Sequence, residues 1–360
     1  MTWLGEQLGR IADDMPERDL AARAIEAHQR RRRNFVALTA AAVVVITVLA
    51  ATIGVRALPT EPRAAARPSS PPELSTITVG VVPSVESAPV YVALAKGYFK
   101  EEGLTVEPRG ITGAAAAVPQ IASGRLDLAQ TDYATLFRTN ELGVGEFKIV
   151  SSLYQAAPGS FAIVVNAKSK IRTAADLKRK KVAVPNLAVL DSLALAAVLK
   201  RAGLTLNDVV QVEKPYHEML AAMDKGQIDA ALLAEPFLTS GREKGRTRIV
   251  EDAMTQEFAN LYTAGMAATD KWISRHPRTL AAFQRALVKA QRLIASDPEQ
   301  VRDVLPSYTK ISRATTANVA LGSYPAKLDL AELQRVADLA RAYKALSRPA
   351  DLRNAVAKGG

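Results

Sequence analysis

Four carboxylates that follow apolar runs are the clearest candidates for binding chemistry in this sequence. They are Glu86, Asp132, Asp191 and Glu235, and the nearest Lys and Arg residues only flank the loops that carry them. Acids without a paired cation suit a ligand that offers hydrogen-bond donors or positive charge, such as an aminopyrimidine or another nitrogenous molecule. A sulfonate instead needs a guanidinium fork or several hydroxyls. Helix N-termini at the same loops would favour an anion, so both ligand classes stay open at this point.

Other residues in the same loops complete the predicted binding set. The loops are PSVES (83–87), GITGAA (110–115), TDY (131–133), PNLAVLDS (185–192), KPYHE (214–218) and AEP (234–236). Besides the four acids, the predicted ligand-binding residues are Ser84, Thr112, Gly113, Tyr133, Asn186 and Tyr216. The two tyrosines could stack on a ring, although aromatic residues in such positions are at least as often part of a core.

Composition and motifs argue against most catalytic and nucleic-acid functions. The chain has no Cys, and its three His residues are far apart in sequence, so we expect no metal site and no cofactor. No Walker loop, dinucleotide-binding glycine motif or GxSxG motif is present, which leaves an enzyme as the weaker alternative. The net charge of +11 includes the Arg run 30–33, and no aromatic residues are interleaved with basic ones, so we expect no nucleic-acid partner.

The elements that must position these loops alternate β-branched runs with helical patterns from residue 76 onward. This alternation predicts βαβ units around mostly parallel sheets, whose ligands bind beyond the carboxyl ends of the strands. The stretch SGRLDLAQTD (123–132) is repeated as KGQIDAALLAEP (225–236), which predicts two similar α/β lobes. Asp127 and Asp229 pair in this repeat, and we expect both to bond local backbone donors where a helix turns into a strand. Glu235, at the other end of its strand, is predicted to contact the ligand.

The N-terminal part of the sequence predicts a membrane anchor. Residues 35–55 carry no charge and as a helix would span roughly 32 Å, enough to cross a bilayer. Because the Arg run precedes them, we predict a cytoplasmic amphipathic tail (1–34), a single transmembrane helix and an extracellular remainder. A cleaved secretory signal is the alternative. The proline-rich residues 56–75 are predicted to form a semi-extended linker.

The order and spacing of several segments resemble the solute-binding proteins of ABC importers for sulfonates, taurine, nitrate and thiamine-pyrimidine precursors. The segments are ITVGVVPSVESAPVYVALAKGYFKEEGLTVE, SGRLDLAQTD, IRTAADLKRKKVAVPN and MDKGQIDAALLAEPF. The resemblance implies an α/β fold, a two-lobed, type II periplasmic-binding-protein-like domain, here preceded by one transmembrane helix. It divides the chain into a first lobe (76–157 and 265–346), a second lobe (168–257), hinge crossovers (158–167 and 258–264) and a C-terminal tail (347–360).

The resemblance also implies a function: capture of a small-molecule solute by lobe closure and delivery to an ABC transporter permease. This chain departs from the family in two ways, since it has no lipidated Cys and none of the cysteines that relatives making the thiamine pyrimidine require. A membrane-tethered ligand sensor is the second alternative, which the proline-rich linker argues against because a flexible tether transmits strain poorly.

Overall fold

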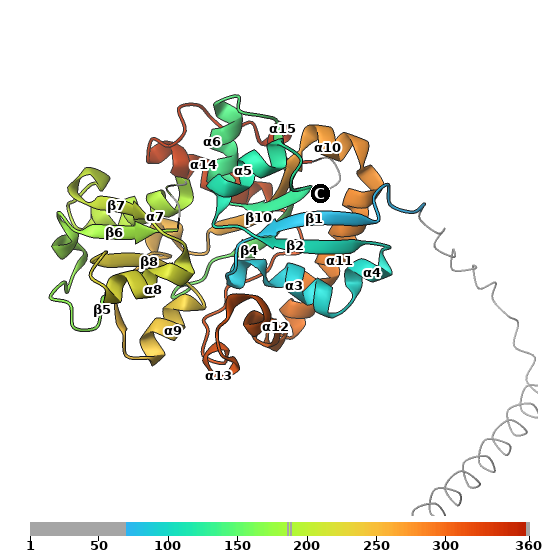
Figure 1. Cartoon of the computed structure of the whole chain (residues 1–360). Helices are drawn as coiled ribbons and strands as arrows, with labels where there is room; N and C mark the ends of the chain where they lie inside the picture. Colours follow the sequence, from blue (N-terminus) through green and yellow to red (C-terminus); the bar gives the residue numbers. More distant parts are fainter. Residues whose placement is uncertain (1–69, 186, 188, 358–360) are drawn as a thin grey trace, which may run out of the picture. The chain divides into compact units, whose positions relative to one another are not determined.

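Two five-stranded sheets form the core of the described chain, which comprises residues 70–185, 187 and 189–357 of a computed structural model (Figure 1). The first sheet has the order β2-β1-β3-β10-β4, with β1 (Thr76–Val81), β2 (Thr105–Gly110), β3 (Leu128–Thr131), β4 (Phe147–Gln155) and β10 (Tyr262–Thr269). The second has the order β7-β6-β8-β5-β9, with β5 (Phe161–Asn166), β6 (Lys181–Val184), β7 (Val210–Glu213), β8 (Ala230–Ala234) and β9 (Thr247–Asp252).

The same pairing pattern occurs in both sheets, which confirms the internal repeat. In each, the first strand of the unit lies between two parallel partners: β1 between β2 and β3, and β6 between β7 and β8. An antiparallel strand follows, β10 in the first sheet and β5 in the second. Of the predicted hinge crossovers 158–167 and 258–264, residues 161–166 belong to β5 and residues 262–264 belong to β10. The chain passes between the sheets through residues 156–160 and 253–261, and these segments are joined by a hydrogen bond from Ala156 N to Leu261 O (2.9 Å).

The repeated acids Asp127 and Asp229 bond backbone donors, but the donors belong to the neighbouring strand. Asp127 accepts a hydrogen bond from Thr78 N in β1 (2.7 Å), and Asp229 accepts one from Lys181 N in β6 (2.8 Å). The expected donor was local, and it is not, because parallel pairing places the start of β1 or β6 beside the turn that precedes β3 or β8. Each acid thus fixes the register of two parallel strands at the edge away from the predicted site.

Helices cover the sheets. The α-helices are α3 (Ala88–Ala95), α4 (Tyr98–Glu101), α5 (Ala114–Ala122), α6 (Tyr133–Glu141), α7 (Val189–Arg201), α8 (Tyr216–Asp224), α9 (Phe237–Glu243), α10 (Asp270–Arg275), α11 (Pro277–Ser296), α12 (Glu299–Thr309), α13 (Arg313–Thr316), α14 (Leu330–Ala342) and α15 (Leu352–Ala355). The 3-10 helices are η1 (Val85–Ser87), η2 (Ala174–Leu177), η3 (Leu206–Asp208) and η4 (Gln256–Phe258). The helical stretch that follows η1 is interrupted at Gly97, which has a left-handed φ of 75° and separates α3 from α4. Helix α5 begins at Ala114, so Pro119 lies inside it.

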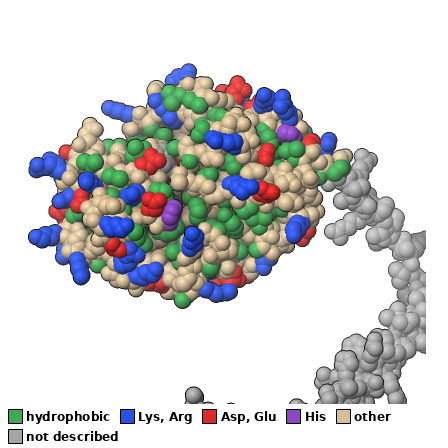
Figure 2. Space-filling view, in the orientation of Figure 1, with side chains coloured by type: hydrophobic (Ala, Val, Ile, Leu, Met, Phe, Trp, Pro, Cys, Tyr) green, Lys and Arg blue, Asp and Glu red, His purple; other side chains and the backbone are tan. Residues whose placement is uncertain are grey.

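The core consists mainly of Val, Ile, Leu and Ala side chains between sheets and helices, as the apolar runs predict. Every residue of β8 is buried, which explains why this strand reads as a continuous apolar run. Helix α11 packs against α3 and α4, whereas α14 contacts α6 as well as α7, so the C-terminal helices join elements of both sheets. Lys and Arg side chains are spread over the face shown in Figure 2 with acids between them, and no basic stripe crosses it.

The predicted cytoplasmic tail, transmembrane helix and most of the linker (1–69) lie outside the described residues. Within residues 70–185, 187 and 189–357, no helix combines the length and the apolar character that a membrane crossing requires. The last part of the predicted linker is described, and it is bound to α11. Glu73 accepts hydrogen bonds from the backbone N–H groups of Arg278 (3.1 Å) and Thr279 (2.7 Å) in the first turn of that helix.

Glu73 provides a test of this attachment. Partial burial raises the pKa of the carboxyl, but the hydrogen bonds from Thr279 and Arg278 outweigh it and lower the pKa from 4.5 to about 2. A lowered pKa contributes stability above pH 4.5 that is lost as the pH falls toward 2. We expect Glu73→Gln to reduce the free energy of unfolding by roughly 1 kcal/mol at pH 7 and by less near pH 3, measured by urea denaturation. An equal loss at both pH values would contradict this account.

Candidate functional site

Loops from both sheets meet in one small, polar cavity, which we call the acid cavity. It is lined by Val82, Glu86, Thr112, Gly113, Ala114, Gln130, Thr131, Asp132, Phe161, Pro185, Leu190, Asp191, Tyr216, Thr263 and Ala264. Six of the ten predicted residues are among them: Glu86, Thr112, Gly113, Asp132, Asp191 and Tyr216. The cavity has a volume of about 50 Å³, room for only a few water molecules.

Glu86 enters the cavity from η1, directly after β1. Its carboxylate accepts hydrogen bonds from Thr263 Oγ1 (2.6 Å) and Gln130 Nε2 (3.3 Å), so β10 and β3 hold it in place. Burial and the charge of Asp132 raise its pKa from 4.5 to about 7, despite the opposing hydrogen bond from Thr263. Near neutral pH, Glu86 therefore exchanges a proton readily.

Asp132 follows β3 and is the N-terminal cap of α6. Its Oδ1 accepts a hydrogen bond from Thr135 N (2.7 Å), which fixes the side chain at the first turn of the helix. Burial raises its pKa from 3.8 to about 6, against the hydrogen bonds from Thr135. The local sequence thus places this acid, and the parallel sheet aims it at the cavity.

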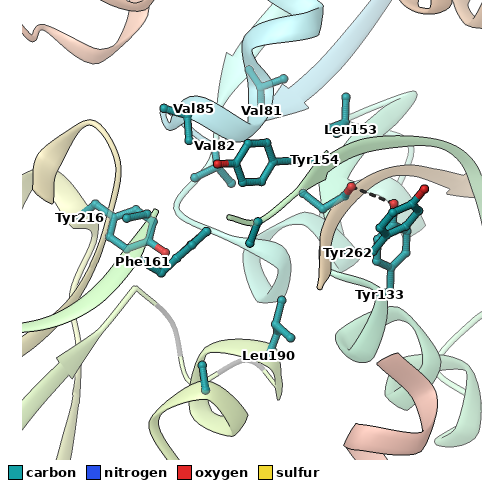
Figure 3. Close-up of a cluster of buried hydrophobic side chains, with 14 of the residues drawn as sticks. Val81, Val82, Val85, Tyr133, Leu153, Tyr154, Phe161, Leu190, Tyr216 and Tyr262 are labelled. Atoms are coloured by element: carbon teal, nitrogen blue, oxygen red, sulfur yellow. Dashed lines mark hydrogen bonds between the residues drawn. The ribbon is translucent and has the colours of Figure 1, made fainter. Parts of the chain in front are cut away.

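Asp191 comes from the second sheet's side, in the first turn of α7. Burial raises the pKa of Asp191 well above its ordinary value, and the charges of Asp132 and Glu86 raise it further, against a hydrogen bond from Tyr216. The Tyr216 hydroxyl bonds this acid from α8, and its own pKa is also raised, first by burial. Figure 3 shows Tyr216 close to Phe161, with Leu190 and Val82 on other sides of the same region.

Three carboxylates therefore face one cavity, and none of the described residues that line it is Lys, Arg or His. Burial is the main reason why the pKa values of all three are raised, and the charges of neighbouring carboxylates raise those of Glu86 and Asp191 further. A ligand that brings positive charge or hydrogen-bond donors would relieve this repulsion. An anion would increase it.

The remaining predicted residues do not line the cavity. Ser84 Oγ accepts a hydrogen bond from Glu86 N (3.3 Å) and so caps η1 beneath the site. Tyr133 is fully buried and donates to Ala264 O (2.8 Å), drawn as the dashed line in Figure 3. Asn186 lies outside the described residues.

Glu235 is placed differently from its prediction as a ligand contact. Its carboxylate is turned toward α9, where it accepts hydrogen bonds from Thr239 N (3.0 Å) and Thr239 Oγ1 (2.7 Å). It also accepts one from Ala320 N (3.2 Å), and its backbone carbonyl accepts one from Val85 N (3.2 Å). The helix starts immediately after Pro236, so the carboxylate satisfies free N–H groups of the first turn instead of reaching the cavity. Glu235 thus connects the end of β8 to the loop after β1.

Several lining residues carry no signal that sequence reasoning could have used. Thr263 and Ala264 belong to β10, which returns to the first sheet long after β3 in sequence. Phe161 and Leu190 are apolar residues in apolar runs. Gln130 lies inside β3 itself, one residue before the predicted loop. Antiparallel pairing of β10 with β3 brings Thr263 to Glu86, and no local pattern indicates that contact.

Comparison with known proteins identifies the family of the chain. Residues 84–301 match the model of the family described as "NMT1/THI5 like". The chain belongs to this family. The predicted resemblance to the solute-binding proteins of ABC importers is thereby confirmed.

Relatives of the chain are mostly named as binding proteins. It is 27% identical over 255 residues to the riboflavin-binding protein RibY of Chloroflexus aurantiacus, covering 68% of this chain and 69% of that protein. It is 26% identical over 243 residues to a putative aliphatic sulfonates-binding protein of Escherichia coli, covering 65% and 73%. Another relative, from Aspergillus parasiticus, is named 4-amino-5-hydroxymethyl-2-methylpyrimidine phosphate synthase, with 25% identity over 224 residues and coverage of 59% and 64%.

The fold is also shared with solved structures. The alkanesulfonate-binding protein SsuA of Xanthomonas axonopodis pv. citri, bound to MOPS, superposes with a TM-score of 0.67 at 18% identity, covering 79% of this chain and 99% of that one. The two-sheet α/β fold therefore matches type II periplasmic binding proteins. At this identity the likeness concerns the fold, and the ligand must be argued from the residues of the cavity.

The raised pKa of Glu86 makes the unliganded protein sensitive to pH. Between 4.5 and about 7 the unfolded carboxyl is ionised while the folded one keeps its proton, so stability falls as the pH rises through this window. We expect Glu86→Gln to gain stability relative to the wild type across that window, by roughly 2 kcal/mol, in urea denaturation at pH 5 and pH 8. Glu107→Gln, an exposed acid on β2, is the control for loss of one charge. A constant difference between Glu86→Gln and the wild type would contradict the expectation.

Replacing Glu235 tests whether its hydrogen bonds hold the two sheets in their relative position. Glu235→Gln replaces an acceptor oxygen with an NH₂ group facing backbone donors, and we expect a loss of roughly 1–2 kcal/mol in unfolding free energy. Because the chain has no Cys, spin labels at cysteines introduced for Lys96 and Arg172 would report a longer or broader distance between the sheets. Glu243→Gln is the matched control. This exposed acid on α9 accepts a hydrogen bond from Asn318, two residues before the Ala320 that bonds Glu235. Equal distances in both variants would argue against a connecting role for Glu235.

Proposed function

We propose that this chain is an extracytoplasmic solute-binding protein that captures a small nitrogenous molecule and delivers it to an ABC transporter permease. The observation that carries the proposal is the acid cavity, where Glu86, Asp132 and Asp191 meet without a basic residue among the described lining. A ligand with a protonated nitrogen or several N–H donors would provide the positive charge or the donors that the lining itself does not offer to the three carboxylates. An aminopyrimidine-like solute fits this requirement better than a sulfonate or nitrate.

The names of the relatives support a small organic ligand without fixing its identity. RibY is named for riboflavin, the protein from Escherichia coli for aliphatic sulfonates, and the protein from Aspergillus parasiticus for an aminopyrimidine phosphate. A sulfonate in this cavity would face three carboxylates, which argues against the second ligand class here. The complete lack of Cys argues against synthesis of a pyrimidine by this chain, so we propose binding without turnover.

Lobe closure is the proposed mechanism. The acid cavity takes residues from both sheets, so separation of the two lobes would open it and closure would surround the ligand. Its volume of about 50 Å³ lies far below the roughly 300–1,000 Å³ of ordinary ligand sites, which supports a need for the lobes to separate before a ligand can enter. The crossovers 156–160 and 253–261 are the candidate hinges.

Membrane attachment remains a proposal from sequence alone. The uncharged residues 35–55, preceded by the Arg run 30–33, would anchor the protein with the binding domain outside the cell membrane and the N-terminus in the cytoplasm.

A ligand screen on the full-length chain tests the function. We expect aminopyrimidines and other cationic nitrogenous molecules to raise the unfolding temperature, and sulfonates and nitrate to have no effect. Affinity for a cation should increase from pH 5 to pH 8, because Glu86 and Asp132, with pKa values of about 7 and 6, must release protons as the ligand binds. Isothermal titration in buffers of different ionisation enthalpy would detect those protons.

Asp191→Asn is the variant that connects the screen to the cavity. We expect it to weaken binding of the best cationic ligand by about tenfold or more, since it removes a carboxyl group that can ionise opposite the bound cation. Glu213→Gln, an exposed acid at the end of β7, is the matched control and should leave affinity unchanged. Tight binding of a sulfonate, or an affinity that Asp191→Asn does not change, would reject the proposed site.

A further inference from the structure

A second cavity, which we call the apolar cavity, lies beside the acid cavity. Its walls come from the ends of β1 and β2 on the first sheet's side and from the starts of α8 and α9 on the second sheet's side. The lining is dominated by apolar side chains, namely Pro83, Ile111, Pro215 and Phe237. Its volume is about 210 Å³, about four times that of the acid cavity.

The two cavities are adjacent, because they share three lining residues, Val82, Thr112 and Tyr216. Tyr216 faces both environments. Its hydroxyl bonds Asp191 on the acid side, while its ring stacks against Phe237, with ring centroids 6.1 Å apart and an interplanar angle of 21°. A ligand that occupies both cavities would therefore contact Tyr216.

The sizes of the cavities determine which part of a ligand each can hold. A volume of about 50 Å³ accommodates a head of a few atoms, such as a protonated amino or amidino group, and the carboxylates there favour positive charge. A planar ring requires the larger space, where apolar walls and the stacked pair Tyr216 and Phe237 offer van der Waals contact to its faces.

From these features we infer that the ligand has two parts: a small cationic nitrogen head for the acid cavity and a flat apolar body for the apolar cavity. The inference rests on the proposed function and specifies the ligand's shape and orientation. The head provides charge recognition, and the body provides most of the buried apolar area. A compact cation without a body would leave the apolar cavity to water.

Gly110 gives a direct way to block the apolar cavity. It ends β2 and lines this cavity, and a Cβ added there would meet no atom within 4 Å. A Leu at this position has room for its side chain beside the apolar cavity, and Gly110 is not among the residues that line the acid cavity. Glu107→Leu, an exposed change on the same strand, is the matched control for added apolar side chain.

The experiment compares benzylamine, ethylamine and benzyl alcohol by isothermal titration on the full-length protein. We expect benzylamine to bind at least about tenfold more tightly than ethylamine, which lacks the body, and than benzyl alcohol, which lacks the charge. Gly110→Leu should weaken benzylamine binding by about tenfold and leave ethylamine binding within about twofold of the wild type. Phe237→Leu, which keeps an apolar wall but removes the ring, should show the same selectivity if Gly110→Leu does not fold.

The outcomes separate the two proposals. If benzylamine and ethylamine bind equally, or if the blocking variants weaken both or neither, the two-part ligand is rejected. The proposed acid site survives that result provided that Asp191→Asn still weakens amine binding. If no amine binds, or if benzyl alcohol binds as tightly as benzylamine, the cationic site itself fails and the two-part inference fails with it.

Discussion

The burial of three carboxylates in one small cavity is the constraint on which the site depends. Each acid is held by a contact that the scaffold provides: Glu86 by Thr263, Asp132 by Thr135 and Asp191 by Tyr216. Placing these charges together disfavours folding at neutral pH, and burial of the Val, Ile, Leu and Ala core must offset that cost. A bound cation would restore both electrostatic balance and stability.

The duplicated sheet explains why acids from distant parts of the chain converge. Parallel strands direct the loops after β1, β3 and β6 toward the same edge of their sheets, and the two sheets turn these edges toward each other. The antiparallel strands β10 and β5 complete the sheets and add Thr263 and Phe161 to the lining. Asp127 and Asp229 repeat one register-fixing contact on the opposite edge. The fold therefore separates residues that hold the strands together from residues that face the acid cavity.

Glu235 illustrates how a carboxylate at the correct end of a strand can serve structure instead of ligand binding. It satisfies the first turn of α9 and receives Ala320 N from the segment after α13, while its carbonyl receives Val85 N. Val85 begins η1, which carries Glu86, so the contact is only one residue away from the acid cavity. Contacts at this position connect the relative placement of the sheets to the geometry of the site.

The sequence by itself determined the βαβ pattern, the repeat, the family resemblance and most loops of the site, because these depend on local periodicity and on residue order. Glu86, Asp132 and Asp191 were predicted for the same reason: each lies in the segment that follows a predicted parallel strand. Only the tertiary structure decided that Tyr133 is a core residue, that Glu235 faces α9 and that Thr263 bonds Glu86. These outcomes depend on helix N–H groups, strand pairing and side-chain direction across residues far apart in the chain, and no short window of sequence contains them.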